Sequence, residues 1–569
     1  MNEHRNMILA IVLSAIVLFG WSFIADRWLP TATPPSTKVV EGKQVALPNP
    51  QADPAADSAG SIRDRREVLV ETPRIPIATP RLQGSLNLKG ARIDDLVLTT
   101  HRESLAANSP AIRLLSPGGA PDAYFASFGW TGDGVSVPGP DTVWTASGNR
   151  LAPGAPVTLS WDNGAGQRFA IVVAVDDGYM FSIDQRVENR GGGAVAAQPY
   201  GIVSRAKASP DPDSWTMHVG PVGVFNGAAN YDWSYDDFVD GARQGFGTSG
   251  GWVGFSDKYW LTALIPDQGS RVDAGFRKNP SGSFQADFIP GAAIVNPARA
   301  STYRSHFFAG AKEIALLERY QTDLGIAKLD KAIDWGWFEW FMRPIFSLLN
   351  WLDKATGNFG VAIICLTLFV RLLMFPIAQR QFRSFAAMRV LQPKMKVLQD
   401  RFKDDKPKLQ QEMLKLYQEE KVNPVAGCLP ILVQIPIFYA LYKVLMLAVE
   451  MRHKPFALWI KDLSAPDPLT PVNLFGFLDF QPPSFLALGV LPILLGITMW
   501  LQFKLNPPPT DPVQKQVFGL MPWVLMFVMA PFAAGLQLYW TVNNILTIAQ
   551  QKWFYSRYPG MRAEPVEAK

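Results

Sequence analysis

Residues 366–376 read LTLFVRLLMFP, and this stretch places one arginine, Arg371, in the middle of an apolar run. An arginine at the centre of a bilayer costs a few kcal/mol on insertion scales, so a membrane helix keeps one only where it has a use. A helix needs roughly 20 apolar residues to cross a bilayer, and the run around Arg371 has about this length. We therefore expect a transmembrane helix at residues 358–380, with a polar site built around Arg371.

The composition agrees with a membrane protein that carries a soluble part. Of the 569 residues, 48% are hydrophobic and only 18% are charged. The net charge of +5 is too small for a surface of this size to indicate a nucleic-acid-binding protein. The two cysteines, Cys365 and Cys428, lie in apolar runs without a CxxC motif or a Cys/His cluster, so we expect neither a disulfide nor a metal site.

The first apolar segment is long enough to span a membrane. Residues 7–25 are nineteen uncharged residues, and as a helix they would extend roughly 29 Å, close to the thickness of the hydrocarbon core. We expect a transmembrane anchor at residues 1–29. The alternative is a cleavable signal peptide, but its apolar region would be shorter and would end at small residues, whereas DRWLP follows here.

A linker and a β-rich domain come next. Proline, alanine and serine dominate residues 30–80, which is typical of a linker that cannot bury enough apolar area to fold. In residues 81–325, short alternating runs such as FAIVVAV and FSIDQRV are separated by Asp-Gly and Gly-Gly turns, which indicates a large antiparallel β-sandwich. A long domain behind a first transmembrane helix is translocated largely regardless of its charge, so we expect this domain in the periplasm.

Residues 333–354 predict an amphipathic helix. Apolar and aromatic residues cover most of this segment, and its polar residues recur at spacings of three or four. These polar residues are Glu339, Arg343, Ser347, Asn350 and Lys354. The pattern is typical of a helix that lies in the membrane interface. The alternative is a helix buried under the β-domain.

Four more transmembrane helices follow from apolar length. Residues 428–449 and 485–503 each have about the length of one crossing. Residues 517–551 contain no charge over 35 residues, roughly 52 Å of helix, which is enough for two crossings. The turn sequence APFAAG divides this run, so we expect helices at residues 517–531 and 534–556. The fold class is therefore a polytopic α-helical membrane protein with six transmembrane helices and a large periplasmic antiparallel β-sandwich domain.

Loop charges set the expected topology. Between residues 379 and 424 there are eleven Lys or Arg against six Asp or Glu, and between residues 450 and 484 there are three against four. By the positive-inside rule, we expect residues 381–422 in the cytoplasm and the loop at residues 450–484 in the periplasm. Both termini, including a short tail at residues 557–569, then lie in the cytoplasm.

Polar residues on three of these helices share one depth. Arg371 lies eight residues from Gln379, Gln434 lies seven past Gly427, and Asn543 and Asn544 lie eight or nine before Lys552. Each is roughly 10 to 13 Å from the cytoplasmic surface. Shared depth predicts a hydrophilic pocket inside the membrane.

Two further patterns extend this pocket. Thr367 lies one helical turn from Arg371, on the same face. On the last helix a polar seam recurs at spacings of three and four, through Gln537, Thr541, Asn544, Thr547 and Gln551.

No Asp or Glu in the six helices can neutralise Arg371, which leaves water as its partner and indicates a wet pocket open to the cytoplasm. The alternatives are an arginine that snorkels or caps its helix, and a Gln434 that only joins two helices.

The basic cytoplasmic segment, residues 381–422, predicts a helical hairpin. Met388, Met395 and Phe402 are seven residues apart, and the pattern breaks at DDKP before it resumes. Its Met-rich, basic surface suits adaptable contact with apolar or anionic partners. The alternative is a spacer that packs only on itself.

Four stretches together resemble the YidC/Oxa/Alb family of membrane-protein insertases, in its Gram-negative form. They are FVRLLMFPIAQRQFRSFAAMRVLQPK, YQEEKVNPVAGCLPILVQIPIFYALY, PFALWIKDLSAPDP and GLQLYWTVNNILTIAQQ, within residues 334–558. The resemblance implies that five of the six helices form an insertase core with a groove open to cytoplasm and lipid. The groove residues it implies, joined by the polar neighbours above, are Arg371, Thr367, Gln434, Tyr539, Trp540, Thr541, Asn543 and Asn544. The hairpin is implied in substrate recruitment, through Met388, Lys394, Met395, Arg401 and Phe402.

The implied function is that of an insertase and chaperone for integral membrane proteins in the bacterial inner membrane, working alone or with the Sec translocon. The resemblance implies no enzymatic reaction and no cofactor. Its implied partners are nascent membrane proteins, membrane lipids, the Sec translocon, and a ribosome or targeting factor at the hairpin.

Two other classes of protein fit the sequence less well. A multi-spanning transporter or channel with a periplasmic ligand-binding domain would be expected to show internal repeats or acidic residues in mid-membrane, and neither is visible. An intramembrane protease would need catalytic groups that are missing here, because the five histidines lie outside the apolar spans and neither HExxH nor a membrane GxSxG motif occurs.

Overall fold

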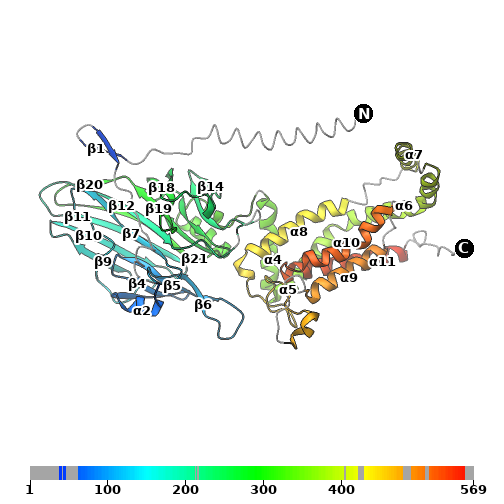
Figure 1. Ribbon diagram of the computed structural model, residues 1–569, viewed down its shortest axis with the longest axis horizontal. Coiled ribbons are helices and arrows are strands. Elements are labelled where there is room, and N and C mark those ends of the chain that lie inside the picture. Colours follow the sequence, from blue (N-terminus) through cyan, green and yellow to red (C-terminus); the bar gives the residue numbers. More distant parts are fainter. Residues whose placement is uncertain are drawn as a thin grey trace. The chain divides into compact units, whose positions relative to one another are not determined.

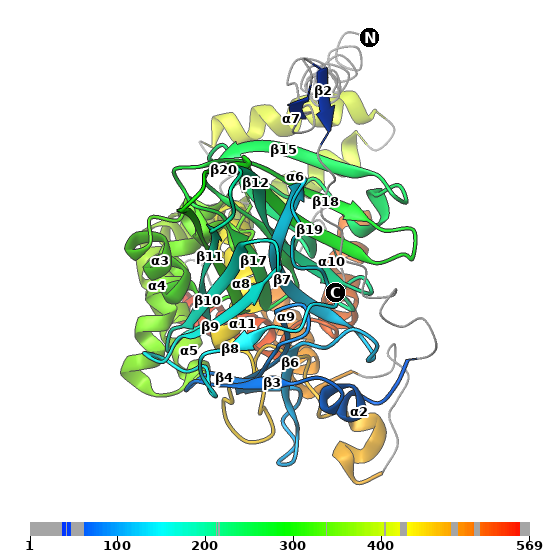
Figure 2. The same ribbon diagram turned by 90° about the vertical axis from the view of Figure 1, so that its left-hand side faces the viewer.

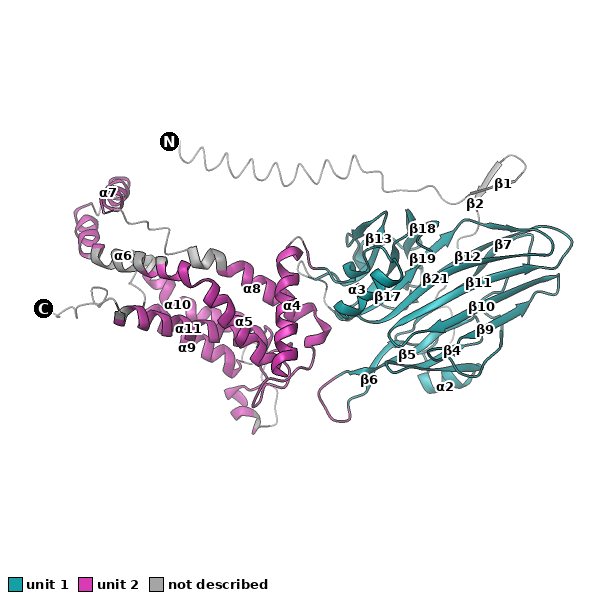
Figure 3. Cartoon of the chain, turned by 180° about the vertical axis from the view of Figure 1, so that it is seen from behind, with its two compact units in different colours: residues 1–103, 109–334 teal, residues 104–108, 335–569 magenta. Residues whose placement is uncertain are grey.

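The computed structural model describes residues 37–40, 43–46, 62–211, 213, 217–336, 338–402, 405–420, 429–478, 488–505 and 512–557. The chain divides into two units, which Figure 3 shows in different colours: residues 1–103 with 109–334, and residues 104–108 with 335–569. The predicted anchor at residues 1–29 and nearly all of the predicted tail at residues 557–569 lie outside the described residues.

In the first unit, some strands bury every second side chain. Along β10 (Gln167–Val175) every second side chain is buried, including Phe169, Ile171 and Val173. Side chains of a strand point to opposite faces in turn, so this period of two turns one face of β10 toward a core. The strand pairs antiparallel with a neighbour on each side, β9 and β11.

Antiparallel strands form two large sheets. One is nine-stranded, in the order β14-β13-β16-β17-β21-β11-β10-β9-β8. Its other strands are β8 (Thr145–Ala146), β9 (Val157–Asp162), β11 (Met180–Asn189), β13 (Gly220–Phe225), β14 (Ala228–Asn230), β16 (Trp252–Ser256), β17 (Trp260–Ile265) and β21 (Arg299–Ala311). Figure 1 shows β9, β10 and β11 side by side.

The second sheet is ten-stranded, in the order β15-β18-β19-β12-β7-β5-β4-β3, with β20 on β12 and β6 on β5. Figure 2 shows β7, β12, β19, β18 and β15 across it. Its strands are β3 (Arg74–Ala78), β4 (Leu82–Asn87), β5 (Arg92–Arg102), β6 (Ala111–Leu115), β7 (Tyr124–Asp133), β12 (Val195–Arg205), β15 (Arg243–Ser249), β18 (Arg271–Lys278), β19 (Phe284–Pro290) and β20 (Ala293–Val295).

Aromatic side chains join the two sheets face to face. From β7 in one sheet, Tyr124 contacts Phe255 on β16 and Phe128 contacts Phe307 on β21, with ring centroids 6.4 and 6.2 Å apart. All four rings are buried. Such edge-on pairs stabilise a core beyond the area they bury. The predicted antiparallel β-sandwich is therefore confirmed.

The predicted boundary between linker and sandwich is wrong. Helix α2 (Arg65–Val70) and strand β3 lie before residue 81, and β3 pairs with β4 through Ile75 and Leu86. A short pair of strands, β1 (Thr37–Val40) and β2 (Lys43–Ala46), also lies in residues 30–80. β3 contains Pro76, which suggested a linker, but β3 is the last strand of its sheet, and edge strands tolerate proline.

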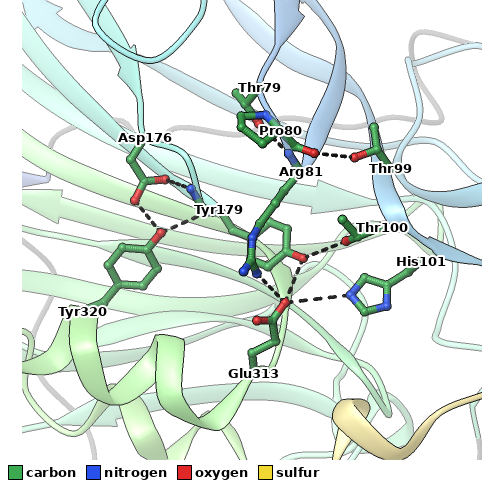
Figure 4. A network of polar contacts seen from close by, with 11 residues as sticks. Thr79, Pro80, Arg81, Thr99, Thr100, His101, Asp176, Tyr179, Glu313 and Tyr320 are labelled. Carbon is green, nitrogen blue, oxygen red and sulfur yellow. Dashed lines mark hydrogen bonds and ion pairs between the residues drawn. The ribbon is translucent and has the colours of Figure 1, made fainter. Parts of the chain in front are cut away.

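A polar network ties the end of the sandwich to helix α3 (Ile314–Asp323), as Figure 4 shows. The carboxylate of Glu313 accepts hydrogen bonds from Arg81 Nη1 at 2.6 Å and from the Tyr179 hydroxyl at 3.1 Å, and its Oε1 lies 3.9 Å from His101 Nε2. Nearby, the Tyr320 hydroxyl donates to Asp176 at 2.5 Å. The network thus joins α3 to three segments that are distant in sequence.

The second unit is helical. Its helices are α4 (Glu339–Thr356), α5 (Phe359–Leu373), α6 (Phe375–Arg401), α7 (Lys406–Glu419), α8 (Leu429–Leu447), α9 (Val490–Leu505), α10 (Pro512–Met529) and α11 (Ala534–Arg557). Short 3₁₀ turns are η5 (Val449–Met451) and η6 (Pro471–Gly476) here, and η2 (Tyr235–Asp237) and η3 (Leu329–Ala332) in the first unit. Helix α11 packs against α5, α8 and α9, and α10 packs against α9. Among the helices of the described residues, none is both long and apolar enough to cross a membrane.

The predicted amphipathic helix at residues 333–354 corresponds to α4, which packs on α5 and α8. Met342, Phe346 and Leu349 are buried along one side, while Trp340 and Trp351 are exposed.

The helix predicted at residues 358–380 is not continuous. α5 ends at Leu373, and α6 begins at Phe375 and runs on into the predicted hairpin. Pro376 explains the break, because proline has no N–H for the helical hydrogen bond and its ring clashes with the carbonyl one turn earlier.

The loop after α8 caps two helices. Asp467 accepts a hydrogen bond from Leu491 N at 2.7 Å, in the first turn of α9. The Ala465 carbonyl accepts from Ala534 N at 2.7 Å, where α11 begins. The first N–H groups of a helix have no partner within the helix, so these contacts satisfy groups that would otherwise be unpaired. The predicted loop at residues 450–484, described as far as residue 478, thus fixes the starts of α9 and α11.

We expect Glu313→Gln to destabilise the β-unit in a pH-dependent way. Burial alone would raise the pKa of Glu313, but hydrogen bonds from its neighbours and the charge of Arg81 lower it to about 2, from an ordinary value of 4.5. Because the folded pKa is the lower one, the stabilisation is complete above about pH 5 and is lost as the pH falls toward 2. At pH 7 the loss of free energy of unfolding should be roughly 2–3 kcal/mol.

Urea unfolding of the full chain, followed by the circular dichroism of its β-sheet, measures this effect. Asp177→Asn is the matched control, because Asp177 is exposed beside the same network. A loss for Glu313→Gln that stayed constant from pH 7 to pH 3 would show that the carboxylate charge is not its cause.

Candidate functional site around Arg371

The side chain of Arg371 reaches from α5 to α11. Its Nε donates to Asn543 Oδ1 at 2.7 Å, and its Nη2 donates to the Asn543 carbonyl at 3.1 Å and to the Thr547 hydroxyl. Asn543 and Thr547 lie one turn apart on α11, so both face the same neighbour. Water was the expected partner of the arginine, but α11 supplies acceptors for three of its N–H groups.

These acceptors satisfy hydrogen bonds without cancelling charge. An amide oxygen, a carbonyl oxygen and a hydroxyl are all neutral, and a guanidinium has five N–H groups of which they take three. Within the part of the chain that the structure describes, no group bonds to Nη1. Nη1 is also not one of the fully buried unpaired side-chain atoms of the described residues. The arginine thus keeps its charge and two open N–H groups.

A second polar contact lies one turn from the first. Gln434 Nε2 on α8 donates to the hydroxyl of Tyr539 on α11 at 2.6 Å. Tyr539 is buried and precedes Asn543 by four residues, roughly 6 Å along the helix. Trp540 packs edge-on against Phe438 of α8, with ring centroids 4.8 Å apart. Gln434 of α8 and Arg371 of α5 therefore contact α11 about one turn apart, and Gln434 contacts the tyrosine and not the arginine.

Other predicted site residues lie apart from the arginine. The hydroxyl of Thr367 bonds to the Ile363 carbonyl of its own helix at 2.7 Å. Asn544 donates to Thr498 on α9 at 3.2 Å. The Thr541 hydroxyl is buried and has no hydrogen-bond partner in the described part of the chain.

The predicted polar seam on the last helix is therefore not one wall of a pocket. Gln537 donates to the last carbonyl of α10 and to two carbonyls just after it, Asn544 binds α9, and of the seam residues Thr547 alone binds Arg371. The residues that the prediction missed are Thr547 as a ligand of Arg371 and Thr498 as the partner of Asn544. Thr498 could have been found from the sequence, because it is a lone hydroxyl residue in the apolar run of α9.

The hairpin residues serve mainly its own packing. Met395 is buried, and its sulfur lies 3.9 Å from the Tyr417 hydroxyl on α7. Lys394 pairs with Glu420 at 2.5 Å, and Arg401 lies over the ring of Phe402. The Met388 side chain lies outside the described part of the chain. For Met395 the structure favours the alternative of a segment that packs on itself, while Lys394 and Arg401 remain exposed.

Two protein families match the chain. The family described as "YidC periplasmic domain" matches residues 74–348, and the family described as "60Kd inner membrane protein" matches residues 351–561. The two matches meet between residues 348 and 351, within α4, whereas the β-rich unit ends at residue 334.

Relatives match over the whole length. A protein from Zymomonas mobilis named "Membrane protein insertase YidC" is 47% identical over 100% of this chain and 98% of its own. One of the same name from Methylobacterium radiotolerans is 42% identical over 99% of this chain and 96% of its own. The solved structure titled "Active YidC insertase crystal structure with the first transmembrane domain resolved" is 19% identical, covers 85% of this chain and 93% of its own, and has a TM-score of 0.37. On the two full-length sequence matches, the chain belongs to the YidC family of membrane protein insertases.

Proposed function

We propose that this protein inserts integral membrane proteins into the bacterial inner membrane and assists their folding, and that the site around Arg371 receives the polar flank of an incoming helix. The observation that carries this proposal is the arginine itself. It is held by neutral acceptors on α11 and keeps its charge and the open N–H groups of Nη1. Such a group can bind a carboxylate without first losing a charged partner.

Insertion needs no covalent chemistry in this scheme. A polar segment that pauses at Arg371 has already passed part of the apolar layer, so the thickness left to cross is smaller. Burial of the apolar part of the incoming helix in lipid then drives its release outward. No enzymatic step or cofactor is required.

The proposal includes a topology. Six transmembrane helices would comprise the anchor at residues 1–29 and five core segments, with both termini and the hairpin in the cytoplasm and the β-unit in the periplasm. The charge of the loops supports this orientation. The exposed Lys394 and Arg401 of the hairpin would contact substrates, a ribosome or a targeting factor, and the Sec translocon and membrane lipids would be further partners.

We expect Arg371→Ala to reduce insertion of a test helix with an aspartate in its flank by about tenfold or more, because a hydrogen bond to a charged group contributes roughly 1.5–3 kcal/mol. Arg371→Lys should restore part of the activity, since it keeps the charge but not the fork of donors. Vesicles that contain the purified full-length chain and receive the test protein measure the rate. Lys552→Ala on α11 is the control for loss of an exposed positive charge. Equal rates for all four proteins would rule out a role for Arg371.

A double substitution separates packing from function at Gln434 and Tyr539. Tyr539→Phe leaves the Gln434 amide without its partner, which should cost roughly 1–3 kcal/mol of stability, whereas Gln434→Leu with Tyr539→Phe should be nearly neutral. Thermal unfolding of the helical unit measures both. If the pair takes part in insertion, the double variant should regain stability but not activity. Recovery of both would assign the pair to packing alone.

A further inference from the structure

Asn543 and Thr547 form a closed arrangement with Arg371. Asn543 supplies two of the three acceptors, its side-chain oxygen to Nε and its carbonyl to Nη2. The Thr547 hydroxyl accepts from Nη2 and itself donates to the Asn543 carbonyl at 2.7 Å. Both α11 side chains are about nine-tenths buried, with 7% of each exposed. The arginine is thus fixed against a buried wall.

This arrangement sets the direction of the guanidinium. The group is planar and rigid, so two fixed nitrogens determine the third. Nε and Nη2 point at α11, and Nη1 therefore points away from it, where no described group bonds to it. A carboxylate that enters from the open side would meet Nη1.

The chemical type of the acceptors matters as much as their position. An aspartate at residue 543 would have nearly the same shape as asparagine, but it would pair with Arg371 and cancel its charge. A carboxylate from outside would then have to displace a charged partner, whereas it now finds an uncompensated cation. Since charge-assisted hydrogen bonds are roughly twice as strong as neutral ones, this difference is large enough to decide which segments bind.

We infer that Asn543 is the positioning residue of this site: it aims Nη1 at the incoming segment and, by being uncharged, makes the site selective for a flank that carries a carboxylate over a neutral flank. This inference rests on the proposed function. Thr547 supports the same geometry, since it binds both partners.

The test uses two versions of one test helix, with aspartate or asparagine at the same flanking position, and vesicles that contain the full-length protein. The unaltered protein should insert the aspartate version at least about tenfold faster. Asn543→Asp should abolish this preference. Circular dichroism and thermal unfolding of the purified variant check that it is folded. A full preference in Asn543→Asp would overturn the inference.

Asn543→Ala tests position alone, because it adds no charge. It also remains informative if the aspartate variant does not fold. The half-saturating concentration of the aspartate version should rise about three- to tenfold with an unchanged maximal rate. An unchanged half-saturating concentration would overturn the positioning role.

Gln550→Ala is the matched control. It removes an amide of α11 that does not contact Arg371, and the variant should behave as the unaltered protein.

Arg371→Ala separates the two proposals. If it inserts both versions normally, the role proposed for Arg371 in insertion fails. If it loses the aspartate version while Asn543→Asp keeps its preference, only the role of Asn543 fails.

Discussion

A positive charge held by uncharged oxygens is the constraint on which the helical unit depends. Arg371 would destabilise an apolar bundle unless its donors found acceptors, and α11 provides them through Asn543 and Thr547. An acidic partner would satisfy the arginine better and would also neutralise it. The observed solution meets the hydrogen-bonding requirement and keeps the charge available.

The acceptors of Arg371 make α11 a polar helix inside an apolar bundle, and three of its other polar side chains bond to neighbouring segments. Tyr539 bonds to Gln434 on α8, Asn544 bonds to Thr498 on α9, and Gln537 bonds to the last carbonyl of α10 and to two carbonyls just after it. The buried Thr541 hydroxyl has no partner among the described residues. The final carbonyls of a helix have no partner within it, so Gln537 caps α10. The loop after α8 holds the start of α11. Contacts around its circumference and at its end thus fix the rotation of α11, and with it the direction of Asn543.

Sequence patterns identify much of this architecture. Alternation with a period of two, together with Asp-Gly and Gly-Gly turns, is sufficient for the sandwich, because each strand buries one face. Apolar length locates the helical segments, and one arginine in an apolar run locates the site. The edge strand β3 was missed because Pro76 resembles a linker residue, and Pro376 interrupts a run that apolar length alone reads as one helix.

The depth of a residue along its helix did not predict which side chain it contacts. Counting along a helix gives height, but which neighbour a side chain meets depends on rotation, and each residue turns by about 100°. Asn543 and Asn544 have almost the same depth, yet one binds Arg371 on α5 and the other binds Thr498 on α9. Sequence could not choose between them, because the choice depends on how five helices pack.

The most direct measurement captures the incoming segment at the site. A photoreactive residue would replace the aspartate in the flank of the test helix, and cross-links to the full-length protein would be mapped during insertion. The aspartate's binding to Arg371 predicts cross-links on α5 near residue 371 and on α11 near residues 543–547. Cross-links confined to the hairpin, or to helices away from these two, would contradict the role assigned to Arg371.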